Sequence, residues 1–212
     1  MLSTKVLEMI IQGRIDELKD LLRDEIYQDA LKKKPGAKQR YAAMKKYFGY
    51  VNSARACCQK PAMVEFEGKT VTSFTNSCSL AFTSEPCGGI ELFTEDDGKY
   101  PNVTHLIKRN MLPRKMRFDK IFAEAKSKGY KLTKQEVNAG RFVLRYKGAY
   151  LRLGLIDATY SIIDDGGEVM VYHNGNPLSP LLIENDIGLC LILPIKYDKA
   201  YIEENNIIVI EV

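Results

Sequence analysis

The spacing of apolar residues along the chain predicts three helices. From residue 4 to residue 31, apolar side chains recur at steps of three and four residues. This spacing makes one face of an amphipathic helix, with Gly13 as a point where the helix weakens or bends. Residues 37–58 repeat the pattern, with lysine and arginine over much of the remaining surface. The third helix is predicted at residues 118–128, where Gly129 follows as a residue suited to a left-handed helix end.

Alternating apolar and polar residues predict strands in most of the remaining chain. Residues 62–74 alternate around a Glu-Gly-Lys turn, as in a β-hairpin, and residues 78–83 continue in the same manner. A second hairpin with a Lys-Gly turn is predicted at residues 142–155. Further strand-like runs follow at residues 168–173, 177–184, 187–195 and 205–212.

The apolar run at residues 187–195 contains Pro194 and is followed at once by charged residues. Proline has no backbone N–H to give to a strand ladder, so it is confined to edges and ends of strands. We therefore expect the strand to leave sheet pairing at Pro194.

The order of a helix, a hairpin and further strands occurs twice, from about residue 37 and from about residue 117. Such segregated helices and antiparallel strands are typical of the α+β class. The pattern predicts two α+β domains of similar plan. Residues 1–109 make the first domain together with an N-terminal helical segment, and residues 110–212 make the second.

Charge is distributed unevenly along the 212 residues. The net charge is +4, but residues 155–212 hold two basic and ten acidic residues. Residues 30–64 hold nine lysines and arginines and no acid, and residues 108–134 hold ten against two acids. Basic clusters of this kind attract polyanions, because neutralising a phosphate releases condensed counterions. An ordinary solvated surface is the equally weighted alternative.

The chain carries none of the motifs that mark common catalytic or metal sites. It lacks phosphate-binding and dinucleotide-binding glycine loops, zinc-protease helices and calcium loops, and its two histidines stand apart from any nucleophile motif. Asp164 and Asp165 precede two glycines, as exposed turns do. We therefore expect no enzyme activity, no catalytic residue, no cofactor and no metal.

Cysteine usage and hydropathy indicate the expected location. No apolar run approaches the roughly 18 residues of a membrane span, so we expect a soluble cytoplasmic protein without a membrane partner. The cysteines are odd in number and form no CxxC pair, so we expect them to be reduced and mostly buried. They are Cys57, Cys58, Cys78, Cys87 and Cys190.

Several segments resemble the bacterial DNA polymerase sliding clamp, the beta subunit of the replicative polymerase. IDATY at 156–160 is similar to the start of a family helix, PLLI at 180–183 to its penultimate strand, and LPIK at 193–196 to its final Met-Pro-Met/Val-Arg-Leu motif. FTNSCSLA at 74–81 is similar to the family's Thr-Asp-Gly-His/Tyr-Arg-Leu-Ala, although its four central residues depart from it. DGKYPNV at 97–103, followed by Leu-Ile, is similar to a domain linker. The likeness covers residues 42–197, in order and hydropathy more than in identity.

The resemblance implies a non-enzymatic clamp-like protein for DNA replication, a processivity factor with basic helices on one face and antiparallel sheets on the other. Duplex DNA would be bound through its backbone without sequence specificity. Clamps also dock peptides of a DNA polymerase or another replication protein in an apolar groove between domains. The groove positions carried over from the family are Thr75, Cys78, Leu80, Leu191, Leu193 and Pro194. The candidates for phosphate contact, chosen from predicted helix faces, are Lys45, Lys46, Arg55, Lys120 and Lys126.

The chain is shorter than a bacterial clamp, which has three domains in each of two subunits. With two domains, a six-domain ring requires a homo-oligomer of three copies, and a phage or mobile element is the expected source of such a shortened relative. A monomeric or dimeric relative that no longer encircles DNA is the alternative. Leu191 and Leu193 could equally be ordinary core residues of a sheet, and the lysines an ordinary solvated surface.

Two other classes of function remain open at this stage. One is a nucleic-acid-binding module of another α+β fold, in which the basic stretch 30–64 would carry DNA or RNA binding. The other is an enzyme with a carboxylate site assembled in space around Asp157, Asp164 or Asp165.

Overall fold

The computed structural model describes residues 4–15, 17–18, 22, 29, 31–50, 53–85, 87–109 and 112–212. Within these residues the protein combines two β-sheets with several short helices, so the predicted α+β class is confirmed. The predicted helix at residues 4–31 is interrupted early. Helix α1 (Thr4–Ile11) ends before Gly13, whose φ of 68° takes the chain out of the helix. Most of residues 16–30 lie outside the described residues.

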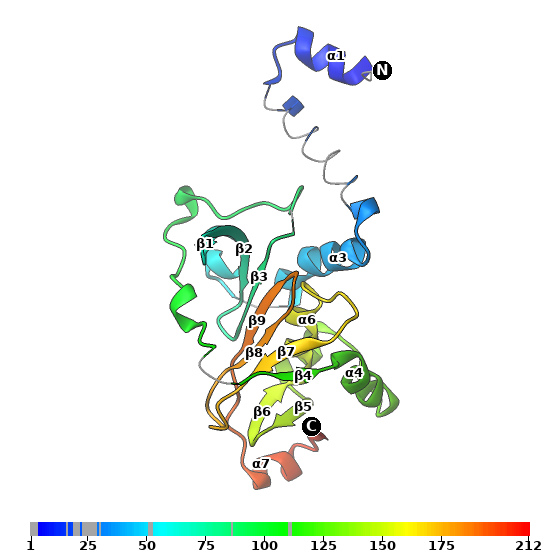
Figure 1. Ribbon diagram of the computed structural model, residues 1–212, viewed down its shortest axis with the longest axis vertical. Coiled ribbons are helices and arrows are strands. Elements are labelled where there is room, and N and C mark those ends of the chain that lie inside the picture. Colours follow the sequence, from blue (N-terminus) through cyan, green and yellow to red (C-terminus); the bar gives the residue numbers. More distant parts are fainter. Residues whose placement is uncertain are drawn as a thin grey trace.

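The large sheet is antiparallel throughout and draws strands from both halves of the chain (Figure 1). Its order is β1-β2-β3-β9-β8-β7-β4, so the meander β1–β2–β3 meets the meander β7–β8–β9 where β3 pairs with β9. The predicted boundary between residues 109 and 110 therefore separates segments that share one sheet. The strands are β1 (Ala62–Phe66), β2 (Lys69–Thr75), β3 (Ser79–Thr83), β4 (Arg114–Met116), β7 (Val169–Tyr172), β8 (Leu181–Glu184) and β9 (Gly188–Ile192).

The small sheet has the order β10-β5-β6, with β10 (Ile208–Glu211) parallel to β5 (Phe142–Tyr146) and β6 (Ala149–Arg152) antiparallel to it. Both predicted hairpins are confirmed, and both close on a two-residue turn with positive φ at each residue. These angles are 50° and 74° in the first turn and 47° and 83° in the second. Turns of this kind match the right-handed twist of the strands they join.

Pro194 lies where the chain passes from the large sheet to the small one. Strand β9 ends at Ile192, and the N–H of Leu193 donates to the carbonyl of Cys78 at 2.9 Å. Ile195 then bridges to Tyr150 of β6, with its N–H donating to the Tyr150 carbonyl at 2.8 Å. Pairing within the large sheet therefore ends two residues before the proline, close to the predicted place, and Ile195 pairs with the small sheet beyond it.

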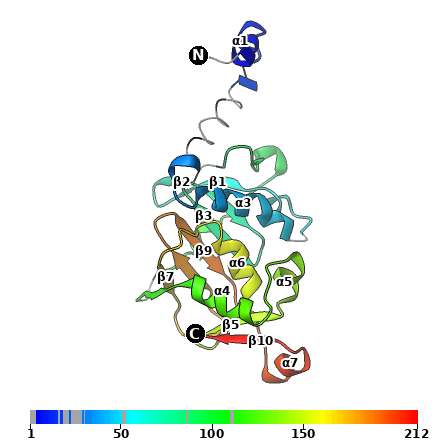
Figure 2. The same cartoon turned by 90° about the vertical axis from the view of Figure 1, so that its right-hand side faces the viewer.

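Four helices, α3, α4, α5 and α6, lie on the same side of the large sheet (Figure 2). Their bounds are α3 (Ala37–Tyr47), α4 (Phe118–Ser127), α5 (Lys134–Ala139) and α6 (Leu153–Tyr160), while α7 (Lys199–Glu204) lies beside the small sheet. The 3-10 turns are η1 (Phe48–Tyr50), η2 (Ala56–Cys58), η3 (Glu95–Asp97) and η4 (Thr104–Leu106). Among the described residues, no helix is both long and apolar enough to cross a bilayer.

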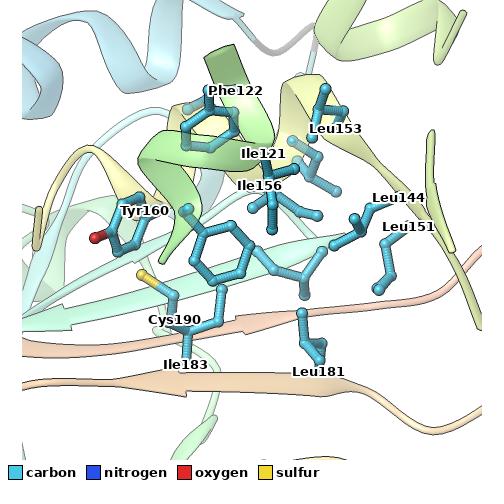
Figure 3. Close-up of a cluster of buried hydrophobic side chains, with 14 of the residues drawn as sticks. Ile121, Phe122, Leu144, Leu151, Leu153, Ile156, Tyr160, Leu181, Ile183 and Cys190 are labelled. Carbon is cyan, nitrogen blue, oxygen red and sulfur yellow. The ribbon is translucent and has the colours of Figure 1, made fainter. Parts of the chain in front are cut away.

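The main core lies between these helices and the two sheets. It gathers apolar side chains from α4, α6, β5, β6, β8 and β9 around Ile156, which is fully buried (Figure 3). Aromatic rings connect α4 to α6, with the Phe118 and Tyr160 ring centroids 5.1 Å apart. Helix α4 is therefore held by burial of one apolar stripe, whereas α6 is buried on nearly all sides.

A second cluster, called the outer core here, lies on the other face of the large sheet. It is covered by the irregular segment that contains η4, through Val103 and the partly buried Ile107. Its buried members are Val71, Leu80, Phe82, Val103, Leu182, Leu189 and Leu191.

Two further sequence predictions were wrong in their bounds, and a third was confirmed. The helix expected at residues 37–58 ends at Tyr47, because Phe48 stacks on Phe74 with ring centroids 5.7 Å apart and Gly49 disfavours further α-helix. Residues 153–155, expected to be strand, begin α6, whose Gly154 lies so close to α5 that a Cβ there would be 2.9 Å from the Val137 nitrogen. The helix at residues 118–128 is confirmed to within one residue, with Gly129 at φ 92°.

Helices α5 and α7 were not predicted, because six residues are too few for an apolar pattern to be recognised. Each has a side-chain cap at its start. Thr133 accepts from the N–H of Glu136 at 3.0 Å, and Asp198 accepts from the N–H of Tyr201 at 2.7 Å. Such caps satisfy backbone N–H groups that a first helical turn leaves without a partner.

The β3–β9 contact allows a direct test, because Gly188 lies opposite Thr83 with no room for a side chain. A Cβ at Gly188 would overlap the carbonyl oxygen of Phe82 and lie 3.0 Å from its carbonyl carbon. We expect Gly188→Ala to lower the free energy of unfolding by about 2 kcal/mol or more, measured by urea denaturation. Gly49→Ala, where the new methyl group meets nothing within 4 Å, should change it by less than about 0.5 kcal/mol. Equal effects of the two substitutions would contradict this account.

Candidate nucleic-acid interface and partner groove

Four of the five lysine and arginine candidates lie exposed on α3 and α4, which cover the same side of the large sheet (Figure 2). Helix α3 buries Ala37, Arg40, Met44 and Tyr47, so that Lys45 and Lys46 point away from the core. Helix α4 buries Phe118, Ile121, Phe122 and Ala125 and leaves Lys120 and Lys126 exposed.

These four lysines form no ion pair with a carboxylate in the described part of the chain, although the charge of Lys126 acts on Asp157. Among the described residues none of them forms an ion pair, whereas Lys128 binds Glu124 at 2.8 Å and Arg117 binds Asp119 at 2.8 Å. The ammonium of Lys45 lies 4.5 Å from the centroid of the Tyr41 ring, a cation–π contact that leaves the charge uncompensated. The helical face thus presents positive charge that is free to meet an anion.

Arg55 is not part of helix α3, although the predicted helix at residues 37–58 included it. It is exposed in extended conformation, with φ −79° and ψ 127°, immediately before the 3-10 turn η2. Its selection from a helix face was wrong because α3 ends eight residues earlier, at Tyr47.

A buried ion pair fixes the start of α3. The Arg40 guanidinium, 1% exposed, donates to the Glu85 carboxylate at 3.2 Å and to the carbonyl of Asp164 at 3.1 Å. Farther along, the Tyr47 hydroxyl lies 3.0 Å from the Ser79 hydroxyl, to which the Thr159 hydroxyl donates at 2.8 Å. Burial raises the pKa of Tyr47 well above its usual range, so this hydroxyl stays neutral. The two networks orient α3 and α6 against β3.

Asp157 is the carboxylate that lies among these helices. It is half-buried on α6 and accepts a hydrogen bond from the Tyr130 hydroxyl at 2.9 Å. Burial raises the pKa of Asp157 above its ordinary value of 3.8, while Tyr130 and the charge of Lys126 act in the opposite direction. Desolvation is the largest of these effects, since it disfavours the charged form.

Asp164 and Asp165 lie in the turn that the sequence predicts. Their Oδ1 atoms accept from the backbone N–H groups of Gly166 and Gly167, each at 2.9 Å. No three histidine, cysteine or acidic side chains within the described ranges gather as metal ligands would. All five cysteines are free, but only Cys58 and Cys190 are buried, so the expectation of mostly buried thiols was only partly right.

The six groove candidates come together at one end of β2, β3 and β9. Thr75 pairs with Leu80, and Leu80 pairs with Leu191, so these three side chains are cross-strand neighbours. Leu80 and Leu191 belong to the outer core, each 2% exposed. Cys78 and Leu193 are exposed and Pro194 is half-buried, so these three of the six candidates are the ones that reach the surface.

Sequence reasoning missed a second group of polar residues at the opposite ends of the same strands. There Arg109 joins Glu67 of the first hairpin turn to Glu184 of β8. The partners lie 42 and 75 residues away from Arg109, and nothing in the local pattern indicates such contacts. The basic run 108–134 includes Arg109 but does not distinguish it from its neighbours.

Comparison with protein-family models, curated proteins and solved structures finds no match to this chain. The resemblance to sliding clamps therefore stays a prediction from sequence segments.

The buried carboxylate of Asp157 predicts a specific dependence of stability on pH. The Asp157 carboxyl holds its proton more tightly in the folded state than in the unfolded state. Its contribution to the free energy of unfolding therefore falls as pH rises above 3.8, the ordinary pKa of this group, toward the raised pKa of the folded state. Asp157→Asn keeps an oxygen acceptor for Tyr130 but does not titrate. We expect it to unfold at a higher temperature than the native chain at pH 7, with the difference shrinking toward pH 4 in thermal denaturation scans.

The control for this measurement is Asp96→Asn, which removes one exposed negative charge from η3. It should not reproduce the pH-dependent gain. A lower stability of Asp157→Asn at pH 7 would show that the Asp157 carboxylate stabilises the folded state, and would contradict the expected cost of burying it.

Proposed function

We propose that this protein is a non-enzymatic, sliding-clamp-like protein that binds the backbone of duplex DNA without sequence specificity. The observation that carries the proposal is the set of four lysines on α3 and α4, which share one side of the large sheet and lack carboxylate partners within the described residues. Phosphate attraction needs no contact with the bases, so a face of this kind suits binding that is independent of sequence.

The arrangement of charge across the helical face supports this proposal. Helix α6 is largely buried, and its one acid, Asp157, is half-buried and accepts a hydrogen bond from the Tyr130 hydroxyl. The lysines of α3 and α4 therefore contribute most of the field that a phosphate backbone would meet at these helices. Each phosphate neutralised by one of them releases counterions, which makes the affinity depend on salt.

Ring closure would use the edge strands of the large sheet. A six-domain ring requires three copies of a two-domain chain, and β1 and β4 are the outermost strands of the large sheet. Pairing of these edges between copies would extend the sheet around the ring and satisfy their outer backbone groups. Partner peptides, such as one from a DNA polymerase, would dock beside Cys78, Leu193 and Pro194, above the floor formed by Thr75, Leu80 and Leu191.

The principal experiment replaces Lys45, Lys46, Lys120 and Lys126 together by glutamine and measures duplex binding by fluorescence anisotropy over a salt series. Each lost phosphate contact should reduce the slope of log affinity against log salt by about 0.9, so the quadruple variant should lose up to about 3.6 of slope. Affinity at low salt should fall correspondingly, and the loss should be the same for duplexes of unrelated sequence.

The matched control replaces four exposed lysines outside these helices, Lys69, Lys99, Lys108 and Lys196, and changes net charge by the same amount. An equal loss in the control would contradict an interface on α3 and α4.

A trimeric mass in solution with retention on circular but not linear duplex would support the ring. Tighter binding to short single strands than to duplex would favour a nucleic-acid-binding module of another α+β kind.

A further inference from the structure

Local hydrogen bonds shape the loop between β7 and β8, called the 174–180 loop here. The Nδ1 atom of His173 accepts from the backbone N–H of Gly175 at 3.2 Å. The Oδ1 atoms of Asn174 and Asn176 accept in the same way from Asn176 and Leu178, each at 2.9 Å. The first five residues of the loop are exposed, whereas His173 is only 2% exposed. His173 therefore anchors the start of an exposed loop in the protein interior.

The anchored loop packs against the β5–β6 hairpin of the small sheet. The imidazole of His173 lies edge-on to the ring of Tyr146 in β5, with ring centroids 5.6 Å apart. The ammonium of Lys147 donates to the carbonyl of His173 at 3.5 Å. At the hairpin turn, a Cβ on Gly148 would lie only 3.3 Å from the ring of Pro177. These contacts join the large sheet to the small one through the 174–180 loop.

This arrangement suits only the neutral form of His173. Because Nδ1 accepts the N–H of Gly175, the proton of the neutral ring is on Nε2. A second proton would have to bind Nδ1, where it would take away the acceptor of the Gly175 N–H. Within the described residues, Nε2 and the Tyr146 hydroxyl are buried without a hydrogen-bond partner, and no carboxylate pairs with His173. A buried imidazolium would therefore lack a compensating anion.

The electrostatic surroundings of His173 also oppose its protonation. Burial lowers the pKa of His173 below its ordinary value of 6.5, and the charge of Lys147 lowers it further, while the backbone of Ser179 acts in the opposite direction. Lys147 and the neutral hydroxyl of Tyr146 are the ionisable groups that face the ring from the hairpin, and the 174–180 loop holds none. The open loop therefore takes up a proton at higher pH than the closed one, and closure loses stability as pH falls below 6.5.

We propose that His173 is a pH-sensitive switch, whose protonation releases the 174–180 loop from the β5–β6 hairpin and uncovers Tyr146. The opening is local, since β7 and β8 keep their own pairing, in which Tyr172 lies opposite Leu182. Tyr146 is 1% exposed in the closed state, so release adds an aromatic ring to the surface where the two sheets meet. The switch does not rest on DNA binding, because it involves neither α3 nor α4.

The test follows the full chain by NMR from about pH 8 to about pH 5. The His173 ring should titrate with a midpoint below 6.5, and the nuclear Overhauser contact between Pro177 and Gly148 should be lost with the same midpoint. This contact reports separation of the loop from the hairpin, which a change of charge alone would not produce. Persistence of the contact while His173 titrates, or a His173 midpoint at or above 6.5, would overturn the proposal.

The matched variants are His173→Asn and His105→Asn. Asparagine does not titrate but keeps an Oδ1 acceptor for the N–H of Gly175, as two asparagines of the loop already do for other residues. His173→Asn should retain the contact between Pro177 and Gly148 at pH 5, and its loss in this variant would assign the pH dependence to another group and overturn the proposal. His105 is exposed in η4, so His105→Asn should lose the contact as the native chain does. The native titration decides the question even if His173→Asn does not fold.

Discussion

The pairing of β3 with β9 is the constraint on which the rest of this structure depends. It joins Ser79 to Ile192 at one end and Thr83 to Gly188 at the other, and so unites two meanders that are about a hundred residues apart in the chain. Gly188 permits this approach, since any side chain there would overlap the backbone of Phe82. Both faces of the large sheet, with their separate cores, exist only because these two strands meet.

The helical face depends on the same strand through hydroxyl groups rather than apolar contacts alone. Ser79 of β3 lies within hydrogen-bonding distance of Tyr47 of α3 and Thr159 of α6, and the buried pair of Arg40 and Glu85 fixes the start of α3. Buried polar groups without partners are costly, which makes such networks selective for one arrangement of helix on sheet. The lysines of α3 are consequently oriented by groups that lie beneath them.

Charge is segregated between the two faces of the large sheet. On the helical face, lysines lie without carboxylate partners in the described part of the chain, which suits a polyanion held by its backbone. On the opposite face, the Arg109 guanidinium is bound by Glu184 and Glu67 beside an aromatic ring, so its charge is compensated. The two faces therefore differ in how their cations are paired.

Local patterns in the sequence were sufficient to predict the α+β class, both hairpins, helix α4 and the end of pairing in the large sheet near Pro194. The signals behind these predictions are apolar periodicity, glycine turns and the missing proline N–H, and each acts over only a few residues. Exposure of Lys45, Lys46, Lys120 and Lys126 followed from the same periodicity. Tertiary structure, together with Gly49, decided where α3 ends, through the stacking of Phe48 on Phe74, and it alone decided which residues surround Arg109. Such contacts join residues tens of positions apart, and their energies depend on burial and geometry that arise only once β3 and β9 have paired.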